Sequence, residues 1–177
     1  MMSSYMGAHT ISRSADTRAV LDAVRRIVRT LHESSRAAQK QVGVSGAQLF
    51  VLQKLAESPG ASLNDLAART HTHQSSVSTV VSRLVDRGLV IRGASAIDGR
   101  RLELRLSAEG RRLLARAPDA AQARLVRTIE QLPAARRRAL SRSLVELTNA
   151  MDLDRRQPVM FFDDHTVAAT RRPAARA

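Results

Sequence analysis

Residues 74–86 combine small hydroxyl side chains with the spacing of a helix, a pattern that could form a binding surface. Residues 74–86 have the period of a helix, with an apolar stripe made of Val77, Val80, Val81 and Leu84. The opposite face then presents Ser75, Ser76, Thr79, Ser82 and Arg83. Side chains this short let a helix approach base edges and phosphates in the major groove of DNA, and the helix N-terminus offers free amides to a phosphate. The alternative is an ordinary solvated face, which would more often carry Glu, Lys or Ala because Ser and Thr are mediocre helix formers.

A basic turn further along the chain could complete such a contact. Residues 89–91 and 102–106 have the pattern of paired strands, and Asp98-Gly99 between them is a strong turn signal. Arg100 and Arg101 follow this turn, where long side chains reach outward and arginine suits a narrow minor groove. Asp98 is placed to orient Arg100 or to fix the turn. The alternative is a solvated charge pair that contributes little to stability.

Two other polar groups are predicted to have no catalytic or metal-binding role. His71 and His73 flank a turn, but two imidazoles without nearby carboxylates make a poor zinc site, so a turn role or a phosphate contact is expected. Residues 163–165 (Asp-Asp-His) resemble a catalytic cluster but stand in a Pro-bounded tail. The sequence contains no Gly-rich phosphate loop, no His-Glu-x-x-His and no Gly-x-Ser-x-Gly. We therefore expect that the protein is not an enzyme and that it binds neither a cofactor nor a metal.

The charge of the chain points to a polyanionic partner. Lys and Arg number 29 against 16 Asp and Glu, a formal net charge of +13, and all of these cations except Lys40 and Lys54 are arginine. A GC-rich codon bias would explain the excess of Arg over Lys but not the net charge. Aromatic residues make up 2% and Trp is absent, which argues against a base-stacking platform. Cysteine is absent, which excludes thiolate metal sites, disulfides and cysteine redox chemistry.

The elements that must position these residues can also be read from the sequence. Helices are expected from about 16 to 40, from a Ser45 cap to Ser58-Pro59-Gly60, over 63–70 behind a Ser62 cap, and over 74–86 with Gly88 as the C-terminal cap. Ser107 should cap a fifth helix that Pro118 interrupts, and Pro133 should precede the last one. Arginines interrupt every apolar stretch and residues 1–11 lack a signal-peptide core, so a cytoplasmic protein without a membrane span is expected.

Taken together, these residues resemble the MarR family of bacterial transcription regulators. The resemblance rests on the run from Ser76 to Val90, the turn Asp98-Gly99-Arg100-Arg101, and Leu106-Ser107 with Gly110 three residues on. It implies a homodimeric winged-helix repressor, less often an activator, usually relieved by a small ligand. It also implies that the first and last helices dimerise, that Arg100 is the minor-groove arginine supported by Asp98, and that the groove-facing positions of the recognition helix are Gln74, Ser75, Ser76, Ser78, Thr79 and Arg83.

The resulting prediction is a mainly α protein with a small β-hairpin wing, a winged helix-turn-helix joined to a helical dimerisation region. Residues 1–15 are expected to be disordered, 16–152 to form the MarR-type domain, and 153–177 to form a tail; within the domain, 16–42 and 108–152 dimerise and 45–106 form the winged helix-turn-helix. The predicted partners are a pseudo-palindromic DNA operator, a second copy of the chain, and an aromatic or aliphatic carboxylate effector held between the dimerising helices and the DNA-binding lobe. The alternative is a basic nucleoid-type protein without ligand control. The apolar run 159–162 (Val-Met-Phe-Phe) is expected to pack on the dimer or to bind a partner.

Overall fold

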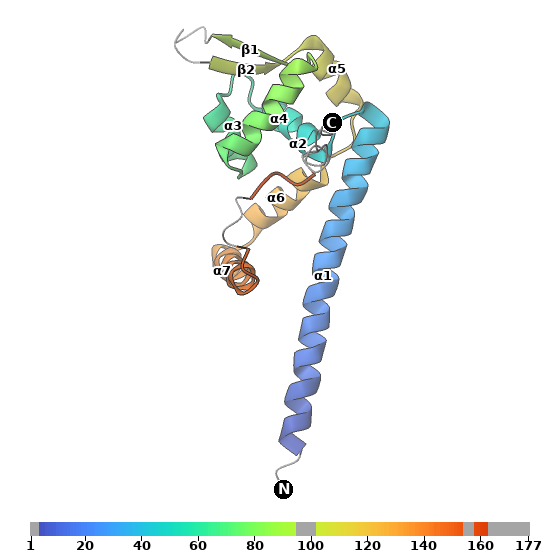
Figure 1. Ribbon diagram of the computed structural model, residues 1–177, viewed down its shortest axis with the longest axis vertical. Helices are drawn as coiled ribbons and strands as arrows, with labels where there is room; N and C mark the ends of the chain where they lie inside the picture. The colour runs from blue at the N-terminus through green and yellow to red at the C-terminus, as the bar shows by residue number, and fades with distance from the viewer. Residues whose placement is uncertain (1–3, 95–101, 154–157, 163–177) are drawn as a thin grey trace, which may run out of the picture.

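The protein consists of a long N-terminal helix and a small helical lobe that lies at the C-terminal end of this helix (Figure 1). The lobe includes a two-stranded hairpin. The computed structural model describes residues 4–94, 102–153 and 158–162, with side chains from Ser14 onward. Helices α1 (Ser4–Val42), α2 (Gly46–Glu57), α3 (Leu63–Thr70) and α4 (Gln74–Asp86) precede strands β1 (Val90–Ala94) and β2 (Leu102–Leu106). Helices α5 (Ala108–Arg116), α6 (Ala121–Gln131) and α7 (Ala134–Ala150) follow. The predicted fold class, mainly helical with a β-hairpin wing, is confirmed.

The helix ends in this lobe are fixed by local hydrogen bonds. The Ser45 and Ser62 side chains each accept a bond from the backbone three residues on, and the side chains of Gln48 and Asp65 accept the reciprocal bond from the cap backbone. Ser107 caps α5 in the same way, accepting from the Gly110 amide at 2.9 Å. These caps satisfy amides that the first helical turn leaves without partners, so the predicted helix starts are confirmed. The predicted interruptions are confirmed too, since α5 ends before Pro118 and α7 begins after Pro133.

The first helix begins earlier than the sequence analysis predicts. It starts at Ser4, whereas residues 1–15 are expected to be disordered. The reason is that residues 4–15 contain no proline and one glycine, so nothing in them stops a helix that is already formed further along. On α1, Arg29 donates to Glu33 at 2.8 Å one helical turn away, and this hydrogen bond together with the Glu33 charge raises the pKa of Arg29 above its usual value.

The hairpin also differs slightly from the prediction. The strand expected at residues 89–91 runs instead from Val90 to Ala94, pairing antiparallel with β2 so that Val90 faces Leu106 and Ala94 faces Leu102. Leu89 is not part of the strand, because its amide bonds back to the Leu84 carbonyl at 2.9 Å and so closes the end of α4. Gly88 supports this ending with a φ of +68°, which confirms its predicted role as the cap.

The core lies in the lobe and is aliphatic apart from Phe50. Phe50, Leu52, Leu66, Val77 and Leu84 are fully buried where α2, α3 and α4 meet. The outer helices are different, because the apolar side chains of α1 and α7 remain largely exposed: Val20, Leu21, Val24, Ile27 and Val28 on α1, and Leu140, Leu144, Val145 and Leu147 on α7. Both helices stand away from the lobe for much of their length (Figure 1). The fold therefore has one packed core, and the apolar side chains of α7 and of the part of α1 before Leu31 lack cover within the described part of this chain.

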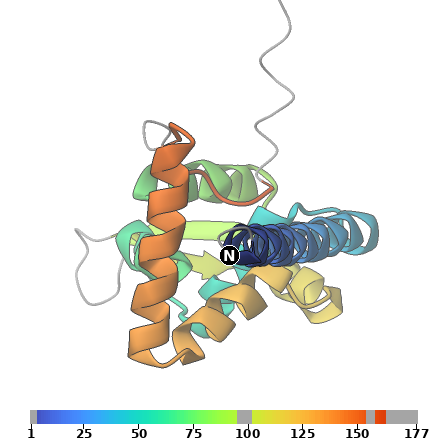
Figure 2. The ribbon, with the colours of Figure 1, turned by 90° about the horizontal axis from the view of Figure 1, so that it is seen from below.

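A short C-terminal segment, Pro158–Phe162, returns from the end of α7 to the lobe (Figure 2). Met160 is only 2% exposed and belongs to the same core as Val77 and Leu84. Phe162 is partly buried against the His32 ring on α1, with ring centroids 4.3 Å apart. Met160 and Phe162 thus pack on their own chain, and the expectation that the cluster packs on the dimer or binds a partner stays a prediction. The apolar side chains of Met160 and Phe162 are buried, that of Phe162 partly, by packing against the lobe and α1.

Candidate nucleic-acid interface

Helix α4 has the two faces that the sequence predicts. Val77, Val80, Val81 and Leu84 are fully buried. On the other side, Gln74 and Ser75 are exposed, and Ser78, Thr79, Ser82 and Arg83 are partly exposed. The Thr79 hydroxyl donates to the Ser75 carbonyl at 3.2 Å, which keeps this side chain close to the helix. The result is a low, hydroxyl-rich surface with few long side chains, which is the shape that close approach to base edges requires.

Ser76 does not lie on this surface, so the expectation that it is presented with Ser75 and Thr79 is wrong. It is 8% exposed, because it stands one turn before Val80 and two turns before Leu84 on the buried side of the helix. Its hydroxyl donates to the Pro158 carbonyl at 3.5 Å. The C-terminal segment thus covers the edge of α4 on which Ser76 lies.

The wing is joined to α4 through an arginine that the sequence analysis did not single out. Arg92 on β1 donates to the Ser82 hydroxyl at 2.9 Å, so the strand and the exposed side of α4 form one continuous surface. Strand alternation gives no signal for this contact, because it places Arg92 on the same face as Val90, whose side chain is buried. The turn residues Asp98, Arg100 and Arg101 lie outside the described residues, between the ends of β1 and β2. Their proposed contact with DNA stays a prediction.

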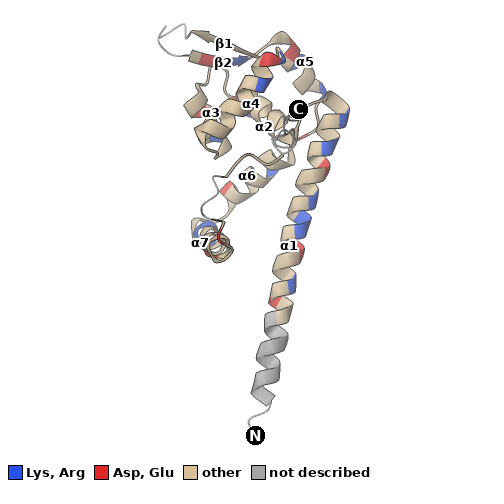
Figure 3. Ribbon diagram, in the orientation of Figure 1, with Lys and Arg blue, Asp and Glu red and all other residues tan. Residues whose placement is uncertain are grey.

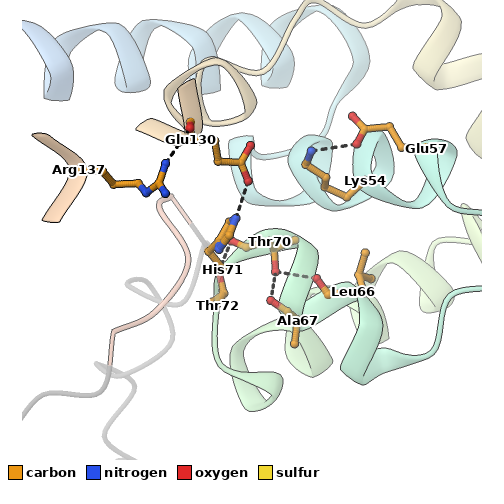
Figure 4. A network of polar contacts seen from close by, with 9 residues as sticks. All are labelled: Lys54, Glu57, Leu66, Ala67, Thr70, His71, Thr72, Glu130 and Arg137. Carbon is orange, nitrogen blue, oxygen red and sulfur yellow. Dashed lines mark hydrogen bonds and ion pairs between the residues drawn. The ribbon is translucent and has the colours of Figure 1, made fainter. Parts of the chain in front are cut away.

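The turn before α4 connects the lobe to α6 (Figure 4). His71 ends α3 in a left-handed conformation, with φ +50°, and its Nε2 lies 2.9 Å from Glu130 Oε1. Arg137 at the start of α7 donates to the Glu130 carbonyl at 2.9 Å. The turn position of His71 matches the prediction, whereas no local pattern predicts the contact with Glu130, 59 residues away in sequence. His73 is the N-cap of α4 but makes no side-chain cap bond.

Surface pockets occur at several places among the described residues, whereas some other kinds of site are lacking there. One pocket of about 420 Å³ lies between α2, β2 and α5, with Leu55, Leu106 and Leu114 in its wall and Arg105 and Arg111 at its edge. A more polar pocket of about 440 Å³ lies beside His71 and Glu130. No three His, Asp or Glu residues of the described chain gather as a metal ion would require, and none of its helices is long and apolar enough to cross a membrane. The 163–165 cluster lies outside the described residues.

Positive charge does not mark the interface by itself. Lys and Arg are spread along α1 and occur on α7 as well as on the lobe (Figure 3). The location of the candidate interface therefore rests on the shape and chemistry of α4 and the wing, and the net charge adds a general attraction for polyanions.

Comparisons with known proteins agree with this geometry. The family model described as "MarR family" matches residues 42–101, from the last residue of α1 to the residue before β2. The HTH-type transcriptional repressor Rv2887 of Mycobacterium tuberculosis is 33% identical over 122 residues, which cover 69% of this chain and 88% of that protein. The solved transcriptional regulator BldR from Sulfolobus solfataricus has the same fold, with a TM-score of 0.50, 20% identity, and coverage of 76% of this chain and 96% of that chain. A structure of Rv2887 in complex with salicylic acid has a TM-score of 0.44 and 32% identity, covering 71% of this chain and 93% of that one.

Proposed function

The chain belongs to the MarR family, whose members regulate transcription by binding DNA rather than acting as enzymes, and we propose that it is a homodimeric repressor released from its operator by a small carboxylate. The setting we propose is the cytoplasm, where such a regulator meets DNA. The observation that carries the proposal is the continuous surface formed by the hydroxyl-rich face of α4 and Arg92 of the wing. Short side chains supply close base contacts, and arginines supply phosphate and minor-groove contacts.

The proposed DNA contacts follow from this surface. Residues of the α4 face would enter the major groove, and the turn between β1 and β2 would reach the adjacent minor groove. The groove-facing residues are Gln74, Ser75, Ser78, Thr79 and Arg83, and the wing residues are Asp98, Arg100 and Arg101. Ser76 would support the helix from behind, because it is buried against the C-terminal segment.

The proposed dimer uses residues 16–42 and 108–152, with 45–106 as the winged helix-turn-helix. The apolar side chains of α1 and α7 that lie open in one chain support it, for example Val24 at 43% and Leu144 at 49% exposure. Helices with one uncovered apolar stripe gain stability by packing against each other. Two copies would present two α4 helices to half-sites about one helical turn apart, which is the spacing of a pseudo-palindromic operator.

For the effector we propose an aromatic or aliphatic monocarboxylate bound in the pocket between α2, β2 and α5. Its volume of about 420 Å³ lies in the range of small-molecule sites. Leu55, Leu106 and Leu114 supply an apolar wall, and the Arg105 and Arg111 guanidiniums supply charge for a carboxylate. The relative Rv2887, similar in sequence over most of its length, has been solved with salicylic acid, a compound of this class. A ligand here would touch both the wing strand and α5, and so reach the two parts that DNA binding must align.

A binding experiment tests the function. Fluorescence anisotropy with labelled duplexes should show a dimer that prefers a pseudo-palindromic site over random duplex and over single strands, with a log–log salt slope of about −0.9 per phosphate neutralised. Equal affinity for all duplexes at raised salt would favour a nucleoid-type protein instead. A monomer that binds single and double strands equally would overturn the proposal.

The effector proposal is tested separately with benzoate and salicylate as probes. Thermal shift of the free protein and operator affinity should respond together, because a ligand can release DNA only if it binds the DNA-incompetent form more tightly. Arg111→Gln should weaken both responses, whereas Arg124→Gln, which changes an arginine elsewhere on the chain, should leave them unchanged. Probes that stabilise the free dimer without changing operator affinity would indicate constitutive repression.

A further inference from the structure

The C-terminal segment Pro158–Phe162 lies at a junction where it contacts both the recognition helix α4 and helix α1. It runs from the end of α7 toward this junction (Figures 1 and 2). At one end the Pro158 carbonyl accepts from Ser76 of α4. At the other end Phe162 packs on His32 of α1 and lines a small hollow with Leu31 and Ala120. The segment therefore touches both the DNA-binding lobe and the helices proposed to dimerise.

The side chains of this segment alternate between the two sides. Met160 is 2% exposed, whereas its neighbours Val159 and Phe161 are 68% and 51% exposed. Met160 is therefore the side chain that the segment buries fully, while Phe162 is partly buried in the turn that follows. Phe162 has a φ of +56°, a conformation that residues other than glycine seldom adopt, and its ring packs against His32. The segment is thus held by specific contacts of Met160 and Phe162 and does not lie loosely on the surface.

The site in which the Phe162 side chain packs has little unfilled volume. The hollow that Phe162 lines together with Leu31, Gly46 and Ala120 has a volume of only about 10 Å³, about the size of one water molecule. Met160 closes the core beside the first turns of α4. Met160 thus belongs to the core of the lobe, and Phe162 packs beside α1 and the start of α6.

The first turn of α4 needs support of this kind. Ser45, Ser62 and Ser107 each cap a helix of the lobe with a side-chain hydrogen bond, but His73 at the start of α4 provides none. A helix start without a cap frays more readily, and fraying here would displace Gln74 and Ser75, which we propose to meet DNA. Ser76 is in this same turn, and the C-terminal segment both accepts from its hydroxyl and buries it.

We infer that Pro158–Phe162 is an intramolecular latch that links the start of the recognition helix to α1 and keeps it ordered for DNA. The latch acts through Met160 and Phe162 on the inner side, and leaves the hydroxyl face of α4 uncovered. Because α1 is one of the proposed dimerisation helices, the latch also fixes how the recognition helix is oriented relative to the dimer; this part rests on the proposed function. Two recognition helices with fixed orientations bind two half-sites with less loss of freedom on binding.

Paired variants on the two sides of the segment test this inference. Met160→Ala should speed amide hydrogen exchange in residues 74–77 and raise the operator Kd at least about fivefold, the lower end of typical coupling between sites. Val159→Ala is the matched control and should change neither. Phe162→Ala and Phe161→Ala form a second pair with the same chemistry and the same expected contrast. Exchange of the α2 amides should stay slow in all four variants, which separates local loosening of α4 from general unfolding.

The absence of tryptophan from the chain gives an independent readout that involves no DNA. A tryptophan introduced by Phe162→Trp should emit at shorter wavelength and resist acrylamide quenching, whereas Phe161→Trp should be quenched freely. Adding operator should leave both signals unchanged, because the latch stays closed on DNA. If Met160→Ala does not fold, the chain ending at Gln157 replaces it, with the same expected loss of order in α4.

Three results would overturn the latch. Equal quenching of the two tryptophans would mean that the segment is not seated in solution. Exchange and affinity of Met160→Ala equal to those of Val159→Ala would mean that the segment does not support α4. A tighter operator complex for Met160→Ala or for the shortened chain would mean that the segment inhibits DNA binding. The exchange and quenching results hold whether or not the proposed operator is correct, so failure of the latch and failure of the proposed function can be told apart.

Discussion

Replacing Gly110 with alanine should destabilise the protein, because the added Cβ would clash with the backbone where the wing meets α5. Gly110 is in the first turn of α5, and a Cβ on it would stand 2.1 Å from the Leu89 carbonyl oxygen and 3.1 Å from its carbon. Real Cβ atoms do not come this close to a carbonyl oxygen, so the backbone must move. The same oxygen accepts from the Ser107 amide at 3.0 Å, and Ser107 is the cap of α5, so displacement of Leu89 disturbs strand and helix together.

The expected magnitude combines three effects. Overpacking of this kind costs about 1–3 kcal/mol, and loss of the Ser107 to Leu89 hydrogen bond adds about 0.5–1.5 kcal/mol. Alanine returns up to about 1 kcal/mol through its better helix propensity, and less than that this close to a helix end. The free energy of unfolding should therefore fall by about 0.5–4.5 kcal/mol, with most of the cost lying in the clash with Leu89.

Urea denaturation at one fixed protein concentration measures this change, since the stability of a dimer depends on concentration. Gly93→Ala is the control, because a Cβ there meets nothing within 4 Å and its φ is not positive. It should leave stability unchanged or raise it by up to about 1 kcal/mol. Gly88→Ala has equally open space but a φ of +68°, so it should cost about 1–2 kcal/mol through backbone strain alone. A Gly110→Ala protein as stable as Gly93→Ala would refute the reasoning.

Three further predictions concern the caps, the dimer and the wing. Ser62→Ala removes the side chain that accepts from the Asp65 amide at 3.2 Å and should lower the free energy of unfolding by about 1 kcal/mol in the same urea assay; no change would count against the cap. Leu144→Asp places a charge on the apolar face of α7 and should shift the protein toward monomer in sedimentation velocity, with loss of operator binding, while a dimer of unchanged affinity would contradict the proposed interface. Arg100→Ala should weaken binding to operator and to A·T-rich competitor alike and make the log–log salt slope shallower by about 0.9 for each phosphate that is no longer neutralised, and unchanged affinity at moderate salt would exclude the proposed role of the wing.

The parts of the structure that the sequence predicts well are those decided by neighbouring residues. The sequence predicts the bounds of α4 as residues 74–86 because one apolar stripe and Gly88 define them locally. It predicts the caps at Ser45, Ser62 and Ser107 because a cap depends on residues at most three positions apart. The alternation of Leu102, Leu104 and Leu106 predicts β2. In each case the pattern and the hydrogen bonds that it predicts lie within one turn or one strand.

The parts that sequence reasoning missed depend on contacts between distant positions. The four-residue spacing of Ser76 from Val80 places it at the edge of the buried stripe, but its contact with the C-terminal segment, 82 residues away, has no local signal. The His71 to Glu130 contact likewise joins residues that no local pattern relates. Met160 lies in a tail whose composition gives no sign that one side chain is buried and the next is not. Helical or strand periodicity cannot report these contacts, because it describes how an element faces its surroundings and not what covers it.

The distribution of charge and shape suggests how affinity and specificity are divided in this protein. The chain has a net charge of +13, and the Lys and Arg residues of its described part are spread over α1, α7 and the lobe rather than gathered at the α4 face (Figure 3). Charges away from that face attract a polyanion and speed its encounter, but salt screens them and they carry no sequence information. The DNA sequence must then be recognised by the small side chains on α4. Because these side chains are short, they can contact base edges only if the helix is held in a precise position. A regulator built this way depends more on what fixes α4 than on how many arginines it carries. Loosening the helix at Met160 should therefore reduce the preference for operator over random duplex, whereas removing an arginine on α7 should lower affinity for both by the same factor.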